Sequence, residues 1–244
     1  MENGERTPQI EDVAALLAVY RVTGPERDEI LALTRASVRG GLWQPHGTPH
    51  KEQASSLQRL EARATVLVSY ELVLVPGLLQ TVPYAQTMMS EIGKLTDQEE
   101  IERRVADRIQ RQAVLHKQGA PHLFAIIPET VLRTAIGGRE VMHDQLRYLI
   151  EAGTRKNVTI RVIPESMHGH PGFDGQFLRI QFAHRKSVVF LSMRTSSLFV
   201  EDEDEVAVYD RVIADLLRRA LPEDESLERI GALADELYSE ASLE

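Results

Sequence analysis

The feature that most constrains the fold is a strand–helix–strand pattern in the second half of the chain. Two short apolar runs, HLFAIIP at 122–128 and NVTIRVIP at 157–164, have the length and apolar character of buried strands. Between them, residues 139–153 read REVMHDQLRYLIEAG, an amphipathic helix that ends at a glycine. Two strands joined through one helix pair in parallel by a right-handed crossover. The pattern therefore predicts a βαβ unit and a sheet with parallel strands.

The residues after this unit predict more sheet and then two helices. Alternating apolar residues predict a hairpin with strands at about 176–182 and 187–193, and SLFV at 197–200 predicts a last short strand. Helical periodicity follows at about 203–220 and 223–240. The predicted fold class is α+β, with a small mixed sheet.

The first half of the chain predicts mostly helices. Their expected ranges are 9–21, 25–38, 50–70, 83–92 and 97–117. Residues 39–49, RGGLWQPHGTP, are rich in glycine and proline and are expected to form a connector. We therefore predict two domains: a helical segment at 1–45 and an α+β domain at 46–244 that binds a ligand or a partner.

The predicted helix at 97–117 has the strongest helical pattern. Its opposite charges four positions apart, Glu99 with Arg103 and Glu100 with Arg104, predict ion pairs. The arginines of this helix alternate with acids, which favours a solvated face over a patch for an anionic ligand. These arginines are Arg103, Arg104, Arg108 and Arg111.

The charge and the composition exclude several classes of protein. The 244 residues carry a formal net charge of −9, which argues against a chain dominated by contacts to nucleic acid or to anionic membranes. The absence of cysteine excludes disulfides, thiolate catalysis and cysteine-ligated zinc. No apolar run approaches the ~20 residues of a membrane span, and the first residues lack the pattern of a secretory signal. We expect a cytoplasmic protein.

The densest group of chemically active side chains lies in HGHPGFDG. His168, His170 and Asp174 could bind a metal, or they could perform acid–base chemistry near neutral pH. Histidines two positions apart on a loop have no fixed geometry, however, and the glycines and proline also suit a plain connection between strands. We expect no metal site, and we keep His168 and His170 as candidate catalytic residues and Asp174 as a candidate ligand contact.

A second candidate is Glu129, which follows the predicted strand in AIIPETVL. Residues at strand ends often contact ligands, so Glu129 could be a general base or a ligand anchor. The interpretation we favour is that Pro128 and Glu129 only begin a short helix, whose dipole the acid complements. Arg133 and Arg161 could each pair with a carboxylate or an anionic ligand, although Arg161 alternates with apolar residues on a strand and could instead point to solvent.

Two further residues are candidate ligand contacts, Tyr84 and Ser192. Tyr84 and Tyr70 flank the block VPGLLQT, and packing with a hydrogen-bonded hydroxyl is the simpler interpretation of both. The sequence has no G-x-S-x-G, phosphate-loop, G-x-G-x-x-G or H-E-x-x-H motif, which disfavours the familiar hydrolases, kinases, nicotinamide enzymes and zinc proteases. We expect no cofactor.

Several stretches resemble a family of actinobacterial regulators. ENGERTPQIEDVAALLAVYRVTGPERDEILAL is similar to the end of a helix-turn-helix domain of the Xre (lambda-repressor-like) type. The stretches SYELVLVPGLLQTVPYAQTMM, RRVADRIQRQAVL, GGREVMHDQLRYLIE and NVTIRVIPESMHGHPGF resemble the C-terminal domain of unknown function of such regulators, sometimes called antitoxin-like or Scr-type. The resemblance covers nearly the whole chain. It implies a helical reader followed by an α+β domain, and a role in transcriptional regulation, often beside a small partner protein.

The chain departs from the family pattern in three places. In SMHGHPG, where the family usually shows a small residue just before the HP pair, this chain adds His168. The helices that would precede ENGERTP, including the one that reads bases in the major groove, are expected to be missing, and the five basic and seven acidic residues before His50 give little attraction to phosphates. In VVFLSMRTSS, Phe190 and Ser192 stand where the family commonly carries a tyrosine and a glutamate. We therefore do not expect the chain to bind DNA sequence-specifically by itself.

Two functions follow as expectations. The first is the effector- or partner-sensing portion of a transcriptional regulator, with a small-molecule effector, a small partner protein and homodimerisation as expected interactions. The alternative is a small-molecule enzyme of secondary metabolism, of cyclase, isomerase or hydratase type, with His168, His170 and Glu129 as acid–base residues.

Overall fold

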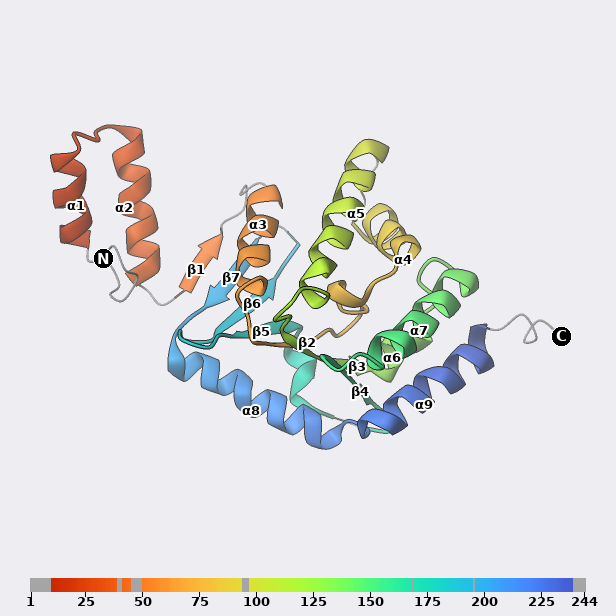
Figure 1. Cartoon of the computed structure of the whole chain (residues 1–244). Coiled ribbons are helices and arrows are strands. Elements are labelled where there is room, and N and C mark those ends of the chain that lie inside the picture. Colours follow the sequence, from red (N-terminus) through yellow and green to blue (C-terminus); the bar gives the residue numbers. More distant parts are fainter. Residues whose placement is uncertain are drawn as a thin grey trace.

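The fold is built on one mixed β-sheet, in a computed structural model that describes residues 10–38, 41–44, 50–93, 97–167, 169–194 and 196–238 (Figure 1). Within these ranges the sheet has seven strands in the order β1-β7-β6-β5-β2-β3-β4. The strands are β1 (Gly41–Gln44), β2 (Val66–Tyr70), β3 (His122–Pro128), β4 (Val158–Ile163), β5 (Phe177–Gln181), β6 (Val188–Ser192) and β7 (Ser197–Val200). Strands β2, β3 and β4 are parallel to one another, and every other pairing is antiparallel. The α+β class predicted from the sequence is confirmed.

Helices surround this sheet and precede it. The α-helices are α1 (Ile10–Val19), α2 (Pro25–Val38), α3 (His50–Glu61), α4 (Val82–Thr87), α5 (Gln98–Gln112), α6 (Glu129–Arg133), α7 (Arg139–Gly153), α8 (Glu203–Arg219) and α9 (Glu223–Leu233). Short 3-10 turns, η1 (Gly77–Leu79), η3 (Ala113–Leu115) and η4 (Pro171–Asp174), and π turns, η2 (Met88–Ile92) and η5 (Ala234–Tyr238), complete the described part. No helix within the described ranges combines the length and apolar character that a bilayer crossing requires.

The predicted βαβ unit and hairpin are confirmed. β3 and β4 pair in parallel, with Pro128 opposite Ile163, and α7 lies between them in the chain. β5 and β6 form the predicted antiparallel hairpin, and β7 continues it. These elements were predictable because each shows its own periodicity over a sufficient length.

Two strands were missed. We predicted one helix from residue 50 to residue 70, but α3 ends at Glu61 and β2 begins at Val66. VLVSY is rich in residues that favour strands, and as an interior strand of the sheet it pairs with both β3 and β5. The predicted connector at 39–49 likewise contains β1, which pairs with β7. The glycines and prolines of this stretch favour a loop, so the sequence pattern did not predict this main-chain pairing.

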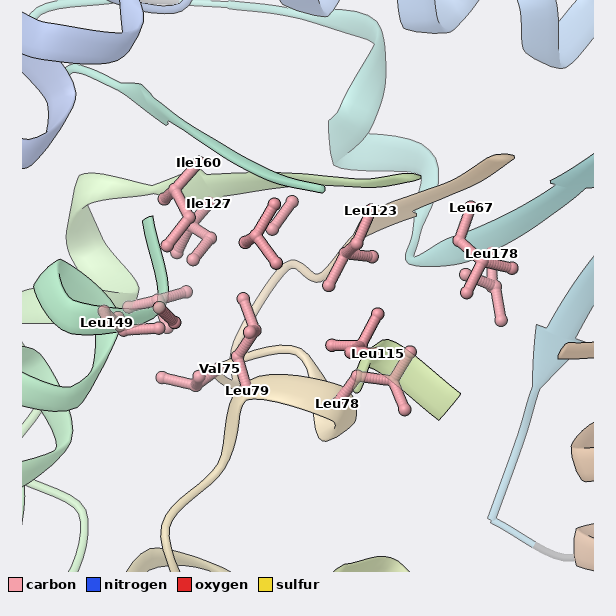
Figure 2. Close-up of a cluster of buried hydrophobic side chains, with 14 of the residues drawn as sticks. Leu67, Val75, Leu78, Leu79, Leu115, Leu123, Ile127, Leu149, Ile160 and Leu178 are labelled. Atoms are coloured by element: carbon pink, nitrogen blue, oxygen red, sulfur yellow. The ribbon is translucent and has the colours of Figure 1, made fainter. Parts of the chain in front are cut away.

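Helices cover both faces of the sheet (Figure 1). On one face, α8 packs against a core cluster that includes Val68, Ile126 and Ile163. On the other face, a larger cluster joins the sheet to the loop around η1 and to α7 and α9, as Figure 2 shows for Leu79, Leu123 and others. Successive residues of β2 and β3 alternate between these two clusters, as the pleat of a strand requires.

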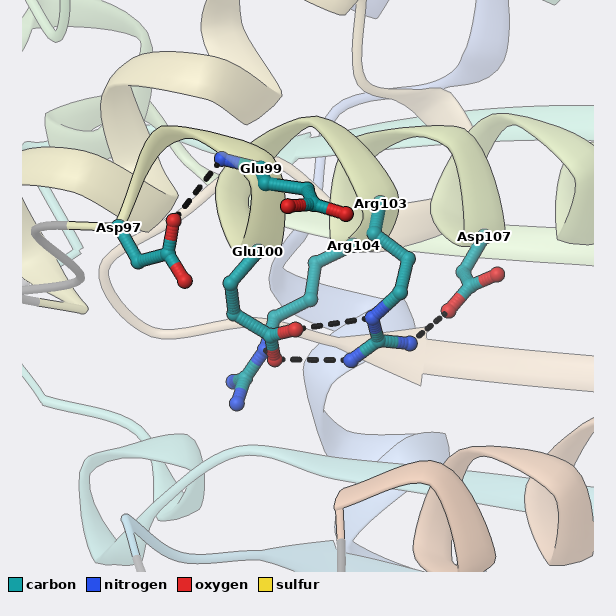
Figure 3. A network of polar contacts seen from close by, with 6 residues as sticks. All are labelled: Asp97, Glu99, Glu100, Arg103, Arg104 and Asp107. Atoms are coloured by element: carbon teal, nitrogen blue, oxygen red, sulfur yellow. Dashed lines mark hydrogen bonds and ion pairs between the residues drawn. The ribbon is translucent and has the colours of Figure 1, made fainter.

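Helix α5 begins at a side-chain cap and carries a chain of ion pairs (Figure 3). The Asp97 carboxylate accepts a hydrogen bond from the amide of Glu99 at 3.1 Å. The predicted Glu100–Arg104 pair is present at 2.5 Å, whereas Arg103 pairs with Glu100 and with Asp107, at 2.8 and 2.9 Å, in place of Glu99. These pairs are partly exposed, so solvent screens their charges and each stabilises the helix only weakly.

Candidate functional site

The carboxyl edge of the three parallel strands gathers acidic side chains. Because β2, β3 and β4 run in the same direction, the residues that follow them lie at one edge of the sheet. These residues include Glu71 after β2, Glu129 after β3 and Glu165 after β4. Such an edge is where open sheets with parallel strands commonly bind ligands.

Glu129 is the centre of an arginine cluster at this edge. It is the first residue of α6, as the helix-start interpretation predicted, and its side chain is only 4% exposed. Its Oε1 atom accepts hydrogen bonds from Arg133 Nε at 2.8 Å and from Arg229 Nη2 at 2.5 Å. Its Oε2 atom faces the amide of Glu165 at 3.4 Å. We call Glu129, Arg133, Glu165 and Arg229 the Glu129 site.

The ionised form of Glu129 is favoured at this site. Burial opposes ionisation, but hydrogen bonds from Arg229 and Arg133 and from the amide of Glu165 together outweigh it and lower the pKa of the Glu129 carboxyl. In turn, the hydrogen bond to Glu129 raises the pKa of Arg229. The cluster is therefore charged at neutral pH.

Two other elements bring Arg229 and Glu165 to Glu129. Arg229 lies on α9, whose first turn is fixed to the sheet by a hydrogen bond from the Val162 amide to Ser226 Oγ at 3.0 Å. Glu165 lies in the loop after β4, with its Oε2 atom 3.4 Å from Arg133 Nε. Sequence reasoning found Glu129 and Arg133 but missed Arg229 and Glu165.

The Glu129 site lines an open pocket of about 450 Å³. A proline, a serine and a leucine also line this pocket. The lining residues are Glu129, Arg133, Pro164, Glu165, Ser166, Leu221 and Arg229. Arg133 and Arg229 are 30% and 33% exposed, so their guanidinium groups reach solvent while Glu129 does not.

His170 lies in a different environment, packed against the end of β2. Its ring stacks on Phe173 with centroids 4.3 Å apart, and it meets the ring of Tyr70 edge-on at 6.1 Å. Burial, with the nearby charge of Arg219, lowers the pKa of His170. His170 Nδ1 and the hydroxyl of Tyr70 are buried, and neither has a hydrogen-bond partner among the residues that the structure describes.

The other predicted contacts do not line the pocket. Tyr84 is fully buried, and its hydroxyl accepts a hydrogen bond from the Val75 amide at 3.1 Å, which fits the packing interpretation. Asp174 is exposed in η4, and Ser192 is exposed at the end of β6. His168 lies outside the described residues. No group of three histidine or acidic residues in the described part of the chain is placed to hold a metal ion.

The possibility that Arg161 points to solvent is wrong. Its guanidinium donates hydrogen bonds to the carbonyls of Leu217, Ala220 and Leu221 at the end of α8. Carbonyls at the carboxyl end of a helix lack partners within it, so a cation at this end stabilises α8. The side chain therefore joins β4 to the end of α8 and is not available to a ligand.

The solvated face predicted for α5 is also partly wrong. Arg111 forms an ion pair with Glu61, whose side chain is 1% exposed, at 2.9 Å. Arg108 donates a hydrogen bond to Gln80 Oε1 at 2.7 Å, and burial lowers its pKa to about 10. Burial also raises the pKa of Glu71 to about 7, against the opposing charges of Arg108 and Arg111.

Buried amides explain the VPGLLQT block. Gln80 Nε2 donates to the carbonyl of Val75 at 2.7 Å, and Gln112 Nε2 donates to the carbonyl of Gln80 at 2.7 Å. A Cβ atom on Gly77 would lie 3.3 Å from Arg108 Nη1, so a glycine lets the arginine pass close to the backbone. The block is thus a buried turn in which side chains from α5 and α7 form hydrogen bonds with main-chain groups of Leu79, Gln80 and Thr81.

Comparison with known proteins places the chain in a family. A search of the curated proteins found no match. A family model matches residues 54–232, well over half of the chain, and this range includes the Glu129 site. The chain belongs to the family described as "Domain of unknown function (DUF5753)".

Proposed function

We propose that this chain is the effector-sensing portion of a transcriptional regulator, and that its effector is a small molecule with a carboxylate or phosphate group bound at the Glu129 site. One observation carries the proposal. Two arginines from separate helices share one oxygen atom of a buried carboxylate, and both arginines line an open pocket. Such paired guanidinium groups are well suited to carboxylates and phosphates.

Glu129 has a positioning role in this proposal. Its buried negative charge holds Arg133 and Arg229 in one place, so that a ligand does not have to order two long side chains. Of the two glutamates of the site only Glu129 is buried, so in this proposal an anionic ligand competes for Arg133 with the exposed Glu165 and not with Glu129.

A bound anion would also join elements that are distant in the sequence. Arg133 is on α6 and Arg229 is on α9, and the hydroxyl of Tyr238, after α9, donates to the carbonyl of Leu132 at 3.0 Å. A ligand that contacts both arginines favours the arrangement in which α6 and α9 are held together. A regulator can convert such a population shift into a change in partner binding or dimerisation. The overall charge of −9 offers no excess positive charge for DNA contacts, so we propose sensing and not base reading as the role of this chain.

Anion binding is testable by thermal unfolding and calorimetry. Phosphate, acetate and succinate are titrated at constant ionic strength, with chloride as the reference. A ligand at ten times its Kd stabilises the folded state by about 1.4 kcal/mol, which raises the Tm of a chain of this size by about 3–5 °C. We expect at least one of these anions to give this shift in the unmodified protein.

Variants separate the site from general charge effects. Arg229→Gln removes half of the guanidinium pair, and we expect it to abolish the anion-dependent shift. Arg63→Gln is the matched control, because Arg63 is an exposed arginine outside the pocket. Equal anion-dependent shifts in the two variants would refute the proposal.

The geometry favours binding over the acid–base enzyme that was the alternative expectation. The lowered pKa of Glu129 makes this carboxyl a poor proton donor near neutral pH. His170, its proposed partner, does not line the pocket. The enzymatic alternative stays a prediction. NMR spectra of the same titration samples test it, since turnover of a bound ligand would produce the signals of a new compound.

A further inference from the structure

We infer that the ligand of the Glu129 site is an α-amino acid or a close analogue, because Arg133 and Arg229 are placed to bind its carboxylate while Glu165, beside them on the rim of the pocket, is placed to bind its amine. This inference rests on the proposed function and adds the chemical class of the effector.

The charges around the pocket favour a ligand that carries both signs. The Glu129 site contains two glutamates and two arginines, and the negative charge of Glu236 also acts on Arg229. A purely anionic ligand gains from the arginines but is repelled by Glu165 and Glu236. A ligand with an added ammonium group turns the repulsion by Glu165 into attraction.

The two glutamates differ in their access to a ligand. Glu129 is 4% exposed and is fully engaged by the arginines, whereas the Glu165 side chain is 62% exposed on the rim. Glu165 Oε2 lies 3.4 Å from Arg133 Nε, so a positive and a negative group stand next to each other at the mouth of the pocket. The carboxylate and ammonium groups of an α-amino acid are attached to the same carbon atom, which matches this close spacing.

The rest of the pocket accommodates an apolar side chain. Pro164 and Leu221 contribute apolar surface to the lining. The volume of about 450 Å³ is in the lower part of the range for small-molecule pockets, which suits a ligand of amino-acid size. Leucine is therefore a suitable probe.

Three probes of one shape test the inference by NMR titration of the whole chain. L-leucine carries both charges, 4-methylpentanoate lacks the amine, and isoamylamine lacks the carboxylate. Because Glu165 is largely exposed, its attraction for the amine has the strength of a surface ion pair, which corresponds to a two- to fivefold effect. We expect leucine to bind two- to fivefold more tightly than 4-methylpentanoate, and isoamylamine to bind more weakly than either.

Variants assign the preference to its residues. Glu165→Gln should make the affinities for leucine and 4-methylpentanoate equal without weakening the binding of 4-methylpentanoate. Arg229→Gln should weaken the binding of both carboxylates, and the control Arg63→Gln should leave all three affinities unchanged.

The outcomes separate this inference from the proposed function. Equal binding of leucine and 4-methylpentanoate by the unmodified protein, or a preference for leucine that survives Glu165→Gln, would overturn the inference and leave anion binding intact. If none of the carboxylates and phosphate bound, both the inference and the proposed function would be wrong.

Discussion

Replacing Gln145 by methionine should destabilise the protein strongly although no ligand contact is lost. Gln145 lies on α7 and is 0% exposed. Its Oε1 atom accepts a hydrogen bond from the Thr81 amide at 2.8 Å, and its Nε2 atom donates to the Leu79 carbonyl at 2.7 Å. One side chain thus satisfies a donor and an acceptor of the buried turn that contains VPGLLQT.

The magnitude follows from these two hydrogen bonds. An unsatisfied buried polar group costs about 1–3 kcal/mol, so two of them cost about 2–6 kcal/mol. Methionine has a similar length and volume, which keeps the contribution of a cavity small. For a chain of this size, 1 kcal/mol corresponds to about 2–4 °C in Tm, so we expect Tm to fall by about 4–24 °C.

Urea and thermal unfolding, followed by circular dichroism, measure this effect. Gln110→Met is the matched control, because Gln110 is an exposed glutamine on α5, and it should change the free energy of unfolding by no more than about 0.5 kcal/mol. Equal stabilities of the two variants would refute the argument that Gln145 holds the turn through its amide.

Two further predictions concern the end of β2, where Gly172 packs on Tyr70 and where Glu71 follows the strand. Gly172→Ala should lower the free energy of unfolding by about 1–3 kcal/mol in urea titrations, because a Cβ atom there would lie 2.4 Å from the ring of Tyr70. The control Gly169→Ala should be nearly neutral, because its Cβ atom would meet no atom within 4 Å. Equal losses of stability in the two variants would contradict this reasoning. Burial raises the pKa of Glu71 from its ordinary value of 4.5 to about 7, so the folded state has the higher pKa. The contribution of Glu71 to stability is therefore full below about pH 4.5 and falls as the pH rises from 4.5 to 7. Above that range the loss of stability is at most about 3 kcal/mol. Glu71→Gln should therefore raise stability more at pH 8 than at pH 5 in unfolding titrations at both pH values, and a gain independent of pH would show that the carboxyl of Glu71 ionises normally in the folded protein.

The proposed site is formed in part by other residues than those that the sequence predicted. The sequence drew attention to the loop with His168, His170 and Asp174, because histidines and acids near one another are chemically versatile. The structure instead joins Glu129 and Arg133 with Arg229, which is 100 positions away from Glu129. No local pattern marks Arg229, since its spacing on α9 is that of an ordinary partly exposed helical residue.

The sequence by itself determined the elements whose side chains report their own periodicity. The βαβ unit, the hairpin of β5 and β6, and helices α5, α8 and α9 each repeat apolar residues at the spacing of a strand or a helix, and that spacing is a local property. Only the tertiary structure decided that VLVSY at 66–70 is an interior strand, because β2 is stabilised by main-chain hydrogen bonds to β3 and β5, more than fifty residues away. The same holds for the Glu129 site, whose charged side chains meet only when the parallel strands bring their ends together and α9 packs next to them. The electrostatic energy between these charges depends on their distance in space and not on their distance along the chain.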